Sequence, residues 1–164
     1  MQAFADLYAE LDATTRTQVK LDALIAYFRD APPADAAWAV YILAGRRMKR
    51  LIGPLKLREW LAEATALPDW LVEETYQHVG DLAETISLLM EGDDQRHAVD
   101  GDLAEWIEQA ILGLRKLDEA EQKAHVLAHW RRLPRPACFL YNKLLTGSLR
   151  VGVSRGLVER ALAS

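Results

Sequence analysis

The spacing of apolar residues constrains the fold of this chain more than any other feature of its sequence. Apolar residues recur three and four positions apart along most of the chain, as in Phe4, Leu7, Tyr8 and Leu11, and this spacing gathers them on one face of a helix. No segment alternates apolar and polar residues as a half-buried strand does. The sequence therefore predicts an all-α fold, a compact domain of about ten helices in two packed helical lobes.

Prolines mark the ends of the predicted helices at residues 32–33, 53–54, 67–68 and 133–136, because proline ends or starts a helix but does not continue one. The polar stretch at residues 91–97 predicts a loop between an N-terminal and a C-terminal lobe. The predicted helices span residues 2–12, 16–30, 34–44, 55–65, 69–78, 81–91, 102–116, 119–132, 135–146 and 155–163.

Length and composition fit one ordinary globular domain. A chain of 164 residues with 51% apolar residues is long enough to bury a hydrophobic core. Its longest apolar runs are a few residues, far short of the roughly 20 that cross a bilayer. The first residues carry acids where a signal peptide carries basic residues. Cys138 stands alone among apolar neighbours, which predicts a buried small side chain without a disulfide. We expect a soluble, cytoplasmic, monomeric domain without a membrane partner.

The charge is distributed unevenly. The formal net charge of −4 argues against non-specific binding to a polyanion. However, residues 46–58 hold six basic side chains and no acid, and residues 131–155 hold another six and no acid. Two such segments could share one face. Clustered cations form either a solvated surface or a track for a phosphate backbone, and composition alone leaves both open.

One pentapeptide, Gly-Asp-Leu-Ala-Glu, occurs at residues 80–84 and again at 101–105. This pattern is typical of a helix start, where the aspartate accepts N–H groups of the first turn and the glutamate reaches back to the cap. We predict this capping at both copies. At Gly80 and Asp81 a second interpretation stays open, since a glycine at the start of a helix can offer backbone N–H groups to a phosphate.

Catalytic motifs are weak throughout the chain. His125 and His129 are four residues apart, as in a metal-binding pair, but no third ligand is evident, so we favour a packed or solvated pair. His78 and His97 have no serine, cysteine or acid arranged as a catalytic relay. Neither a P-loop nor a dinucleotide-binding glycine motif is present. The sequence therefore predicts no catalytic residue and no metal site in this domain.

The segment at residues 146–156, TGSLRVGVSRG, concentrates three glycines and two arginines in one loop. Gly147 can end the preceding helix in a left-handed conformation, and Ser154 can cap the following one. These roles alone would make the segment a helix connector. Alternatively, free N–H groups at the last helix, together with Arg150 and Arg155, form an anion site. The residues themselves leave these two interpretations balanced.

Three stretches of the chain together resemble the sequence of one known protein family. The run Asn142 to Gly147, followed by Arg150, Gly152, Val153 and Ser154, resembles the end of the N-terminal DNA-binding domain of bacterial-type ATP-dependent DNA ligases. The opening at residues 1–32 and the stretch at 78–89 resemble the same family. Because the resemblance covers essentially the full length, we interpret residues 1–164 as one whole domain of a larger enzyme.

The resemblance implies an all-helical domain that holds nicked double-stranded DNA from the minor-groove side, through phosphates and sugars and without sequence specificity. It implies a parent ATP-dependent DNA ligase that seals nicks in repair, replication and recombination in the bacterial cytoplasm, associated with the nucleoid. The nucleotidyltransferase and OB domains, ATP and Mg²⁺ belong to the rest of that enzyme, with no cofactor in this domain. The implied DNA-binding residues are Gly147, Ser148, Leu149, Arg150, Gly152, Ser154, Arg155, Lys143, Gly80 and Asp81.

Within this set, Arg150 is the leading candidate for a phosphate or minor-groove contact, Gly152 lets the backbone approach DNA, and Lys143 is a weaker candidate that could serve packing. Four further cations could extend the track: Arg46, Arg47, Lys49 and Arg50. In the family the reactive lysine lies in a Lys-x-Asp-Gly motif of the next domain. Lys20 and Lys116 come within one residue of that motif but lack its glycine, so we expect this chain alone to be inactive.

The alternative from another functional class is a helical protein-interaction module that binds no nucleic acid. In that case the arginines are solvated, and the tryptophans form core or a partner surface. Tryptophans at helical spacing are usually core, so they do not favour this alternative. The five tryptophans are Trp38, Trp60, Trp70, Trp106 and Trp130.

Overall fold

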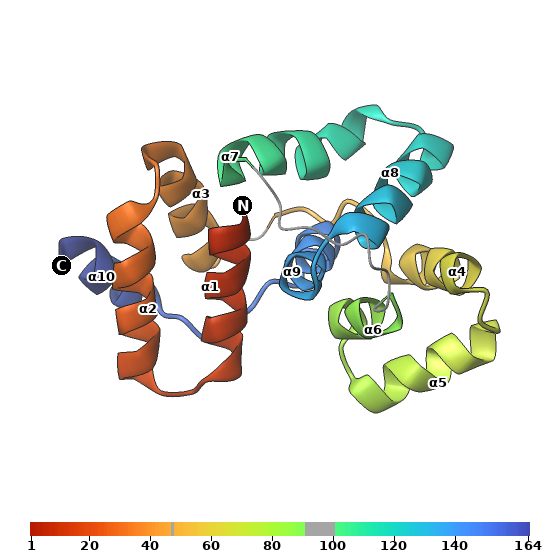
Figure 1. Cartoon of the computed structure of the whole chain (residues 1–164), viewed down its shortest axis with the longest axis horizontal. Helices are drawn as coiled ribbons and strands as arrows, with labels where there is room; N and C mark the ends of the chain where they lie inside the picture. Colours follow the sequence, from red (N-terminus) through yellow and green to blue (C-terminus); the bar gives the residue numbers. More distant parts are fainter. Residues whose placement is uncertain (47, 91–100) are drawn as a thin grey trace.

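The computed structural model describes residues 1–46, 48–90 and 101–164, and the secondary structure of these residues is helical throughout (Figure 1). This confirms the predicted all-α fold. The α-helices are α1 (Gln2–Ala13), α2 (Thr17–Asp30), α3 (Pro33–Leu43), α4 (Pro54–Thr65), α5 (Asp69–Val79), α6 (Leu82–Leu89), α7 (Leu103–Trp106), α8 (Glu119–Arg132), α9 (Arg135–Thr146) and α10 (Arg155–Ala163). None of the helices in these ranges has the length and apolar character of a membrane span.

Helix α9 lies at the centre of the molecule. It packs against α1 on one side and α6 on the other. In Figure 1, α1, α2, α3 and α10 stand on one side of α9, whereas α4, α5 and α6 stand on the other. The expected division into sequential N- and C-terminal lobes is therefore wrong, because the last helix packs on α2 and α3. The loop predicted at residues 91–97 lies outside the described residues.

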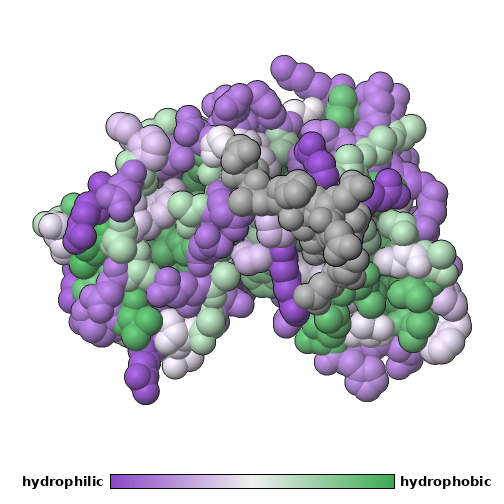
Figure 2. Space-filling view, in the orientation of Figure 1, coloured by the Kyte–Doolittle hydropathy of each residue, from purple (hydrophilic) through white to green (hydrophobic). Residues whose placement is uncertain are grey.

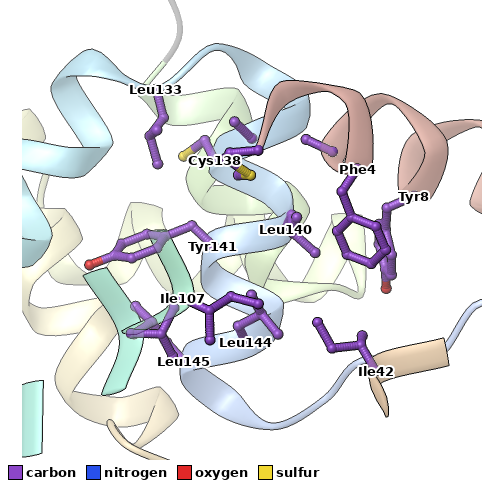
Figure 3. Packing of buried hydrophobic residues seen from close by; sticks show 14 of the residues in the cluster. Phe4, Tyr8, Ile42, Ile107, Leu133, Cys138, Leu140, Tyr141, Leu144 and Leu145 are labelled. Atoms are coloured by element: carbon purple, nitrogen blue, oxygen red, sulfur yellow. The ribbon is translucent and has the colours of Figure 1, made fainter. Parts of the chain in front are cut away.

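The sequence of α9 explains its central position, since apolar residues occupy both of its sides. Figure 3 shows Leu140 directed toward Phe4 and Tyr8 of α1, with Tyr141 on the opposite side of the helix. Cys138 is fully buried here, as predicted. A helix that is apolar around most of its circumference must be covered on several sides, and α9 therefore holds the two groups of helices together.

The one amide buried in α9 is fully engaged. Asn142 accepts the indole N–H of Trp130 at 2.8 Å and donates to the Cys138 carbonyl at 2.8 Å. A buried polar group without partners would cost free energy, so these bonds make the asparagine compatible with the core. They also tie α8 to α9.

The segment after α7 departs from the prediction of one helix over residues 102–116. Regular α-helix ends at Trp106, and a π-helix (η1, Ile107–Ile111) and a 3₁₀-helix (η2, Leu112–Lys116) follow. Side chains of α8 contact carbonyls in this segment: Gln122 donates to Leu114 O at 2.9 Å, and His125 Nε2 lies 3.3 Å from Ala110 O. Because these side chains supply partners, the carbonyls do not depend on regular i to i+4 bonding.

The two Gly-Asp-Leu-Ala-Glu copies behave differently. Asp81 caps α6 by accepting the Glu84 N–H at 2.9 Å, which confirms the aspartate's part of the predicted cap. Asp102 makes no such bond at the start of α7, so the prediction is wrong for the second copy. Instead, the buried carboxylate of Asp35 in α3 accepts the N–H groups of Leu103 and Ala104, each at 3.0 Å. A tertiary contact replaces the local cap.

Most tryptophans belong to the core, in agreement with their helical spacing. Trp60, Trp106 and Trp130 are buried and Trp38 packs partly buried against the core, whereas Trp70 is 67% exposed. The face seen in Figure 2 is largely hydrophilic, and its apolar surface is most extensive over α5 and α6. Trp70 belongs to α5, one of the two helices with the most apolar surface on this face.

Candidate nucleic-acid interface

Parts of the two acid-free basic segments, residues 48–52 and 143–150, meet at the C-terminal end of α9. The α3–α4 connector (residues 44–53) crosses this end, and its Leu51 and Ile52 N–H groups donate to the Leu145 carbonyl at 2.9 and 3.3 Å. The α9–α10 loop (residues 147–154) leaves from the same point. Arginines and lysines separated by about a hundred positions in sequence are thus brought to one edge of the fold.

Gly147 makes this meeting possible. It ends α9 in the left-handed conformation, with φ +67°, which confirms its predicted capping role. Its backbone also lies against the connector: a Cβ added there would be 2.8 Å from Met48 O and 3.5 Å from Arg50 N. Glycine is therefore required twice, once for the backbone conformation and once for the close approach of the connector.

Four exposed cations surround this contact. Arg46, Lys49 and Arg50 come from the α3–α4 connector, and Arg150 comes from the α9–α10 loop. None of them forms an ion pair with another described residue. Arg47, the fourth connector cation, lies outside the described residues. Uncompensated cations at one edge create a local positive potential despite the negative net charge.

A pocket opens between the two basic segments. Its lining includes the cations Arg46, Lys143 and Arg150 and the backbone at Gly147, with apolar side chains such as Leu149 completing the wall. Three cations around one concavity favour an anionic group there. The structure thus brings together four of the predicted site residues, Lys143, Gly147, Leu149 and Arg150, with an additional arginine from the connector.

Lys143 and Asp81 form an ion pair across the junction of α9 and α6, and the Lys143 ammonium also lies 5.3 Å from the centroid of the Phe139 ring. This pairing reduces the charge that Lys143 presents to a ligand. Gly80 ends α5 with φ +80°, and its N–H donates to Tyr76 O at 2.8 Å. The Gly80 N–H is thus already hydrogen-bonded within the protein and is not available to bind a phosphate.

The remaining loop residues have identifiable structural partners. Ser148 Oγ lies 2.7 Å from Thr146 Oγ1. Ser154 caps α10, as predicted, by accepting the Leu157 N–H at 3.2 Å. Arg155 donates from Nε to Glu159 at 2.8 Å on an exposed helix face. These contacts fix the two ends of the loop and leave Arg150 as its exposed cation.

Beneath the loop lies a residue that the sequence reasoning missed as a site residue. Lys20 of α2 is only 7% exposed, and its Nζ donates to Val151 O at 2.8 Å and to Gly152 O at 3.1 Å. Gly152 has φ +57°, and a Cβ there would meet that Nζ at 3.2 Å. The sequence did indicate that Lys20 could be buried, because Lys20 precedes Leu24 by four positions and lies on the same apolar helix face.

The histidine pair lies away from this edge, in the core contact between α8 and α9. His129 Nδ1 donates to the His125 carbonyl at 2.7 Å, and its ring stacks on Tyr141. Burial lowers the pKa of His129 to about 4, an effect that the hydrogen bond to His125 opposes and the nearby charges of His125 and Arg132 reinforce. In the described ranges, no three His, Cys, Asp or Glu side chains are grouped as metal ligands.

Comparisons with known proteins agree with the resemblance noted in the sequence. Residues 1–163 match the sequence model of a family described as DNA ligase N terminus. A protein named DNA ligase from Cenarchaeum symbiosum (strain A) is 26% identical over 148 residues, which are 83% of this chain and 25% of that relative. The chain therefore spans about a quarter of the length of the curated relative that it matches.

Proposed function

Because the chain belongs to the DNA ligase N-terminal family, we propose that it binds nicked duplex DNA and positions it for the catalytic domains of an ATP-dependent DNA ligase. Binding is directed at the phosphate backbone and is independent of base sequence. Chemistry resides in other parts of the parent enzyme, where ATP and Mg²⁺ act. This chain contributes affinity and placement of the substrate.

One observation carries the proposal: cations from both acid-free basic segments converge near Gly147 and line one pocket. Neutralising phosphates with lysine and arginine releases condensed counterions, and this supplies affinity without reading the bases. Exposed cations without acidic partners are the groups suited to that task. A solvated surface of the same composition would not need two distant segments at a shared concavity.

The placement of the cations also favours backbone contacts over base reading. Arg46, Lys49, Arg50 and Arg150 lie on connectors between helices, whereas direct readout uses side chains along a helix or ribbon that enters the major groove. Phosphate contacts set register and orientation without carrying sequence information. A ligase that acts at any nick requires this kind of binding, and we propose an approach from the minor-groove side.

The two near matches to the Lys-x-Asp-Gly motif support a division of labour with other domains. The Lys20 amine is buried and donates to two carbonyls, so it is a poor candidate for a nucleophile. Lys116 is exposed at the end of η2 and lacks the glycine of the motif. We propose that the adenylylated lysine belongs to another domain of the parent enzyme. The bacterial origin, cytoplasmic location and roles in repair, replication and recombination remain predictions.

Fluorescence anisotropy with labelled nicked duplex, intact duplex and single-stranded DNA of matched length tests the proposal. We expect salt-sensitive binding of duplex DNA, modest in affinity for the isolated chain because linked domains multiply affinity in the full enzyme. Binding should be equal for two unrelated duplex sequences. Absence of duplex binding at low salt would overturn the proposal.

A protein-interaction module remains the competing function, and the exposed side chains of Trp70 and Leu55 are the observation that favours it. Aromatic residues are enriched in protein interfaces. The same titration separates the two functions, because an interaction module would leave DNA anisotropy unchanged. Replacing Trp70 with serine should not alter DNA binding if the exposed cations around Gly147 form the binding site.

A further inference from the structure

The α9–α10 loop is held from below by a buried lysine of α2. Lys20 Nζ lies 2.8 Å from Val151 O and 3.1 Å from Gly152 O, contacts that span 131 and 132 positions in sequence. The first of these acceptors immediately follows Arg150, the exposed cation of the loop. The amine therefore fixes the backbone at the point that determines the direction of the Arg150 side chain.

The hydrogen-bond partners of Lys20 are unusual for a buried lysine. Lysine is almost never fully buried unless its charge is paired, yet Lys20 forms no ion pair with any described residue. Among the described residues, its hydrogen-bond acceptors are the two loop carbonyls. Placing an ammonium group in the interior is costly unless its hydrogen bonds are made, so any other path of residues 151–152 would leave that charge with fewer partners.

Gly152 adapts the loop to this amine. In an extended chain successive carbonyls point to opposite sides, so two in succession reach one amine only where the backbone turns between them. The left-handed φ of +57° at Gly152 provides this turn. The 3.2 Å between a Cβ at Gly152 and Lys20 Nζ shows that the amine also occupies the space a side chain would need.

Tyr8 of α1 also lies close to the backbone of the loop. Its hydroxyl is buried and lies near the backbone amide of Arg150 without completing a hydrogen bond within the described part of the chain. Between the Tyr8 hydroxyl and the Lys20 amine, the amine is thus the group that hydrogen-bonds to the loop. The conformation of residues 150–152 depends on α2 rather than on local sequence alone.

We propose that Lys20 is a positioning residue that holds the α9–α10 loop in the conformation in which Arg150 meets a DNA phosphate; this rests on the proposed DNA-binding function. Lys20 does not contact DNA itself, since the loop covers it. Its effect on affinity passes through Arg150. Lys20, in the second helix of the chain, thus positions a DNA-binding loop near the end of the chain.

The Lys20→Met variant tests this role, because methionine keeps a long apolar stem and removes the amine. Losing two charge-assisted bonds should lower the affinity for nicked duplex about tenfold. Amide hydrogen exchange of residues 149–153 should become faster in the DNA-free protein. The Lys116→Met variant removes one exposed lysine elsewhere and serves as the charge-matched control, with affinity and loop exchange close to the wild type.

A double-mutant cycle distinguishes positioning from a general structural effect. If Lys20 acts through Arg150, Lys20→Met should have little further effect on affinity in an Arg150→Ala background, whereas independent effects would add. Should Lys20→Met fail to fold, Gly152→Ala disturbs the same contact from the loop side while keeping the charge, and the same cycle applies. Additive effects, or wild-type affinity in a folded Lys20→Met protein, would overturn the proposal.

The exchange measurement separates this inference from the proposed function. If the wild type binds no DNA, the proposed function fails together with the role assigned to Arg150, even if loop exchange still depends on Lys20. If the wild type binds DNA but loop exchange is unchanged in Lys20→Met, only the positioning role of Lys20 fails.

Discussion

Replacing Gly147 with alanine perturbs the point at which the two basic segments meet. Two costs add at this position. The left-handed φ of +67° costs an L-residue about 1–2 kcal/mol. The new Cβ would lie 2.8 Å from Met48 O, and relieving such an overpacked contact costs a further 1–3 kcal/mol or so. We expect the free energy of unfolding to fall by about 2–5 kcal/mol.

Urea unfolding followed by circular dichroism measures this loss, and Gly80→Ala provides a matched control. Gly80 also ends a helix with a left-handed φ, of +80°, but a Cβ there would meet no atom within 4 Å. The control should therefore lose only the backbone cost of about 1–2 kcal/mol. The free energy of unfolding falls by about 1–3 kcal/mol per M urea. The additional loss from the contact with Met48 should therefore place the urea midpoint of Gly147→Ala measurably below that of Gly80→Ala.

The same substitution should weaken DNA binding under native conditions, because relief of the clash moves the α3–α4 connector away from Arg150. Gly101→Ala is the control for this readout: its φ is +101°, and the nearest atom to its Cβ lies at an ordinary 3.9 Å. If Gly147→Ala and Gly80→Ala unfold at the same urea concentration, the close approach of the connector is not a stabilising constraint. If Gly147→Ala keeps wild-type affinity for DNA, binding does not depend on how the α3–α4 connector is placed relative to the α9–α10 loop.

Two further predictions concern the core. Asp35→Ala should lower the free energy of unfolding by about 2 kcal/mol, because two N–H groups of α7 lose their acceptor, whereas Asp102→Ala should change it by less than about 0.5 kcal/mol; equal losses in urea unfolding would contradict the tertiary cap. The pKa of His129 is lowered to about 4, so the unfolded chain binds its proton first, near pH 6.5. Stability should be retained above pH 6.5 and decline toward pH 4, and His129→Gln should flatten that decline in unfolding measured across this range.

The helices could be predicted from sequence because their signals are local. Periodicity and prolines gave α8, α9 and α10 the bounds observed in the structure, and Ser154 and Gly147 were recognised as caps from their residue types. Such signals act over a few residues and depend little on the rest of the fold. The same local reasoning failed at α7, where Asp35 supplies the cap from 68 positions away.

The binding edge could be predicted only in part, because its assembly depends on long-range contacts. The sequence marked Arg150 and both basic segments, but it could not show that Met48 lies against Gly147 or that Lys20 reaches beneath Gly152. These contacts follow from the packing of α9 between the two groups of helices, and from α10 returning to α2 and α3. The burial of a lysine charge is decided by tertiary structure, and only its place on an apolar helix face was visible beforehand.

The salt dependence of binding to nicked duplex is the most direct measurement of whether the edge around Arg150 contacts phosphates. Each phosphate contact contributes about 0.9 to the slope of log K against log salt concentration. We expect a steep slope for the wild type, a slope smaller by about 0.9 for Arg150→Ala, and a wild-type slope for Arg115→Ala, which removes an exposed arginine of η2. A slope that Arg150→Ala leaves unchanged would show that the DNA phosphates are held elsewhere.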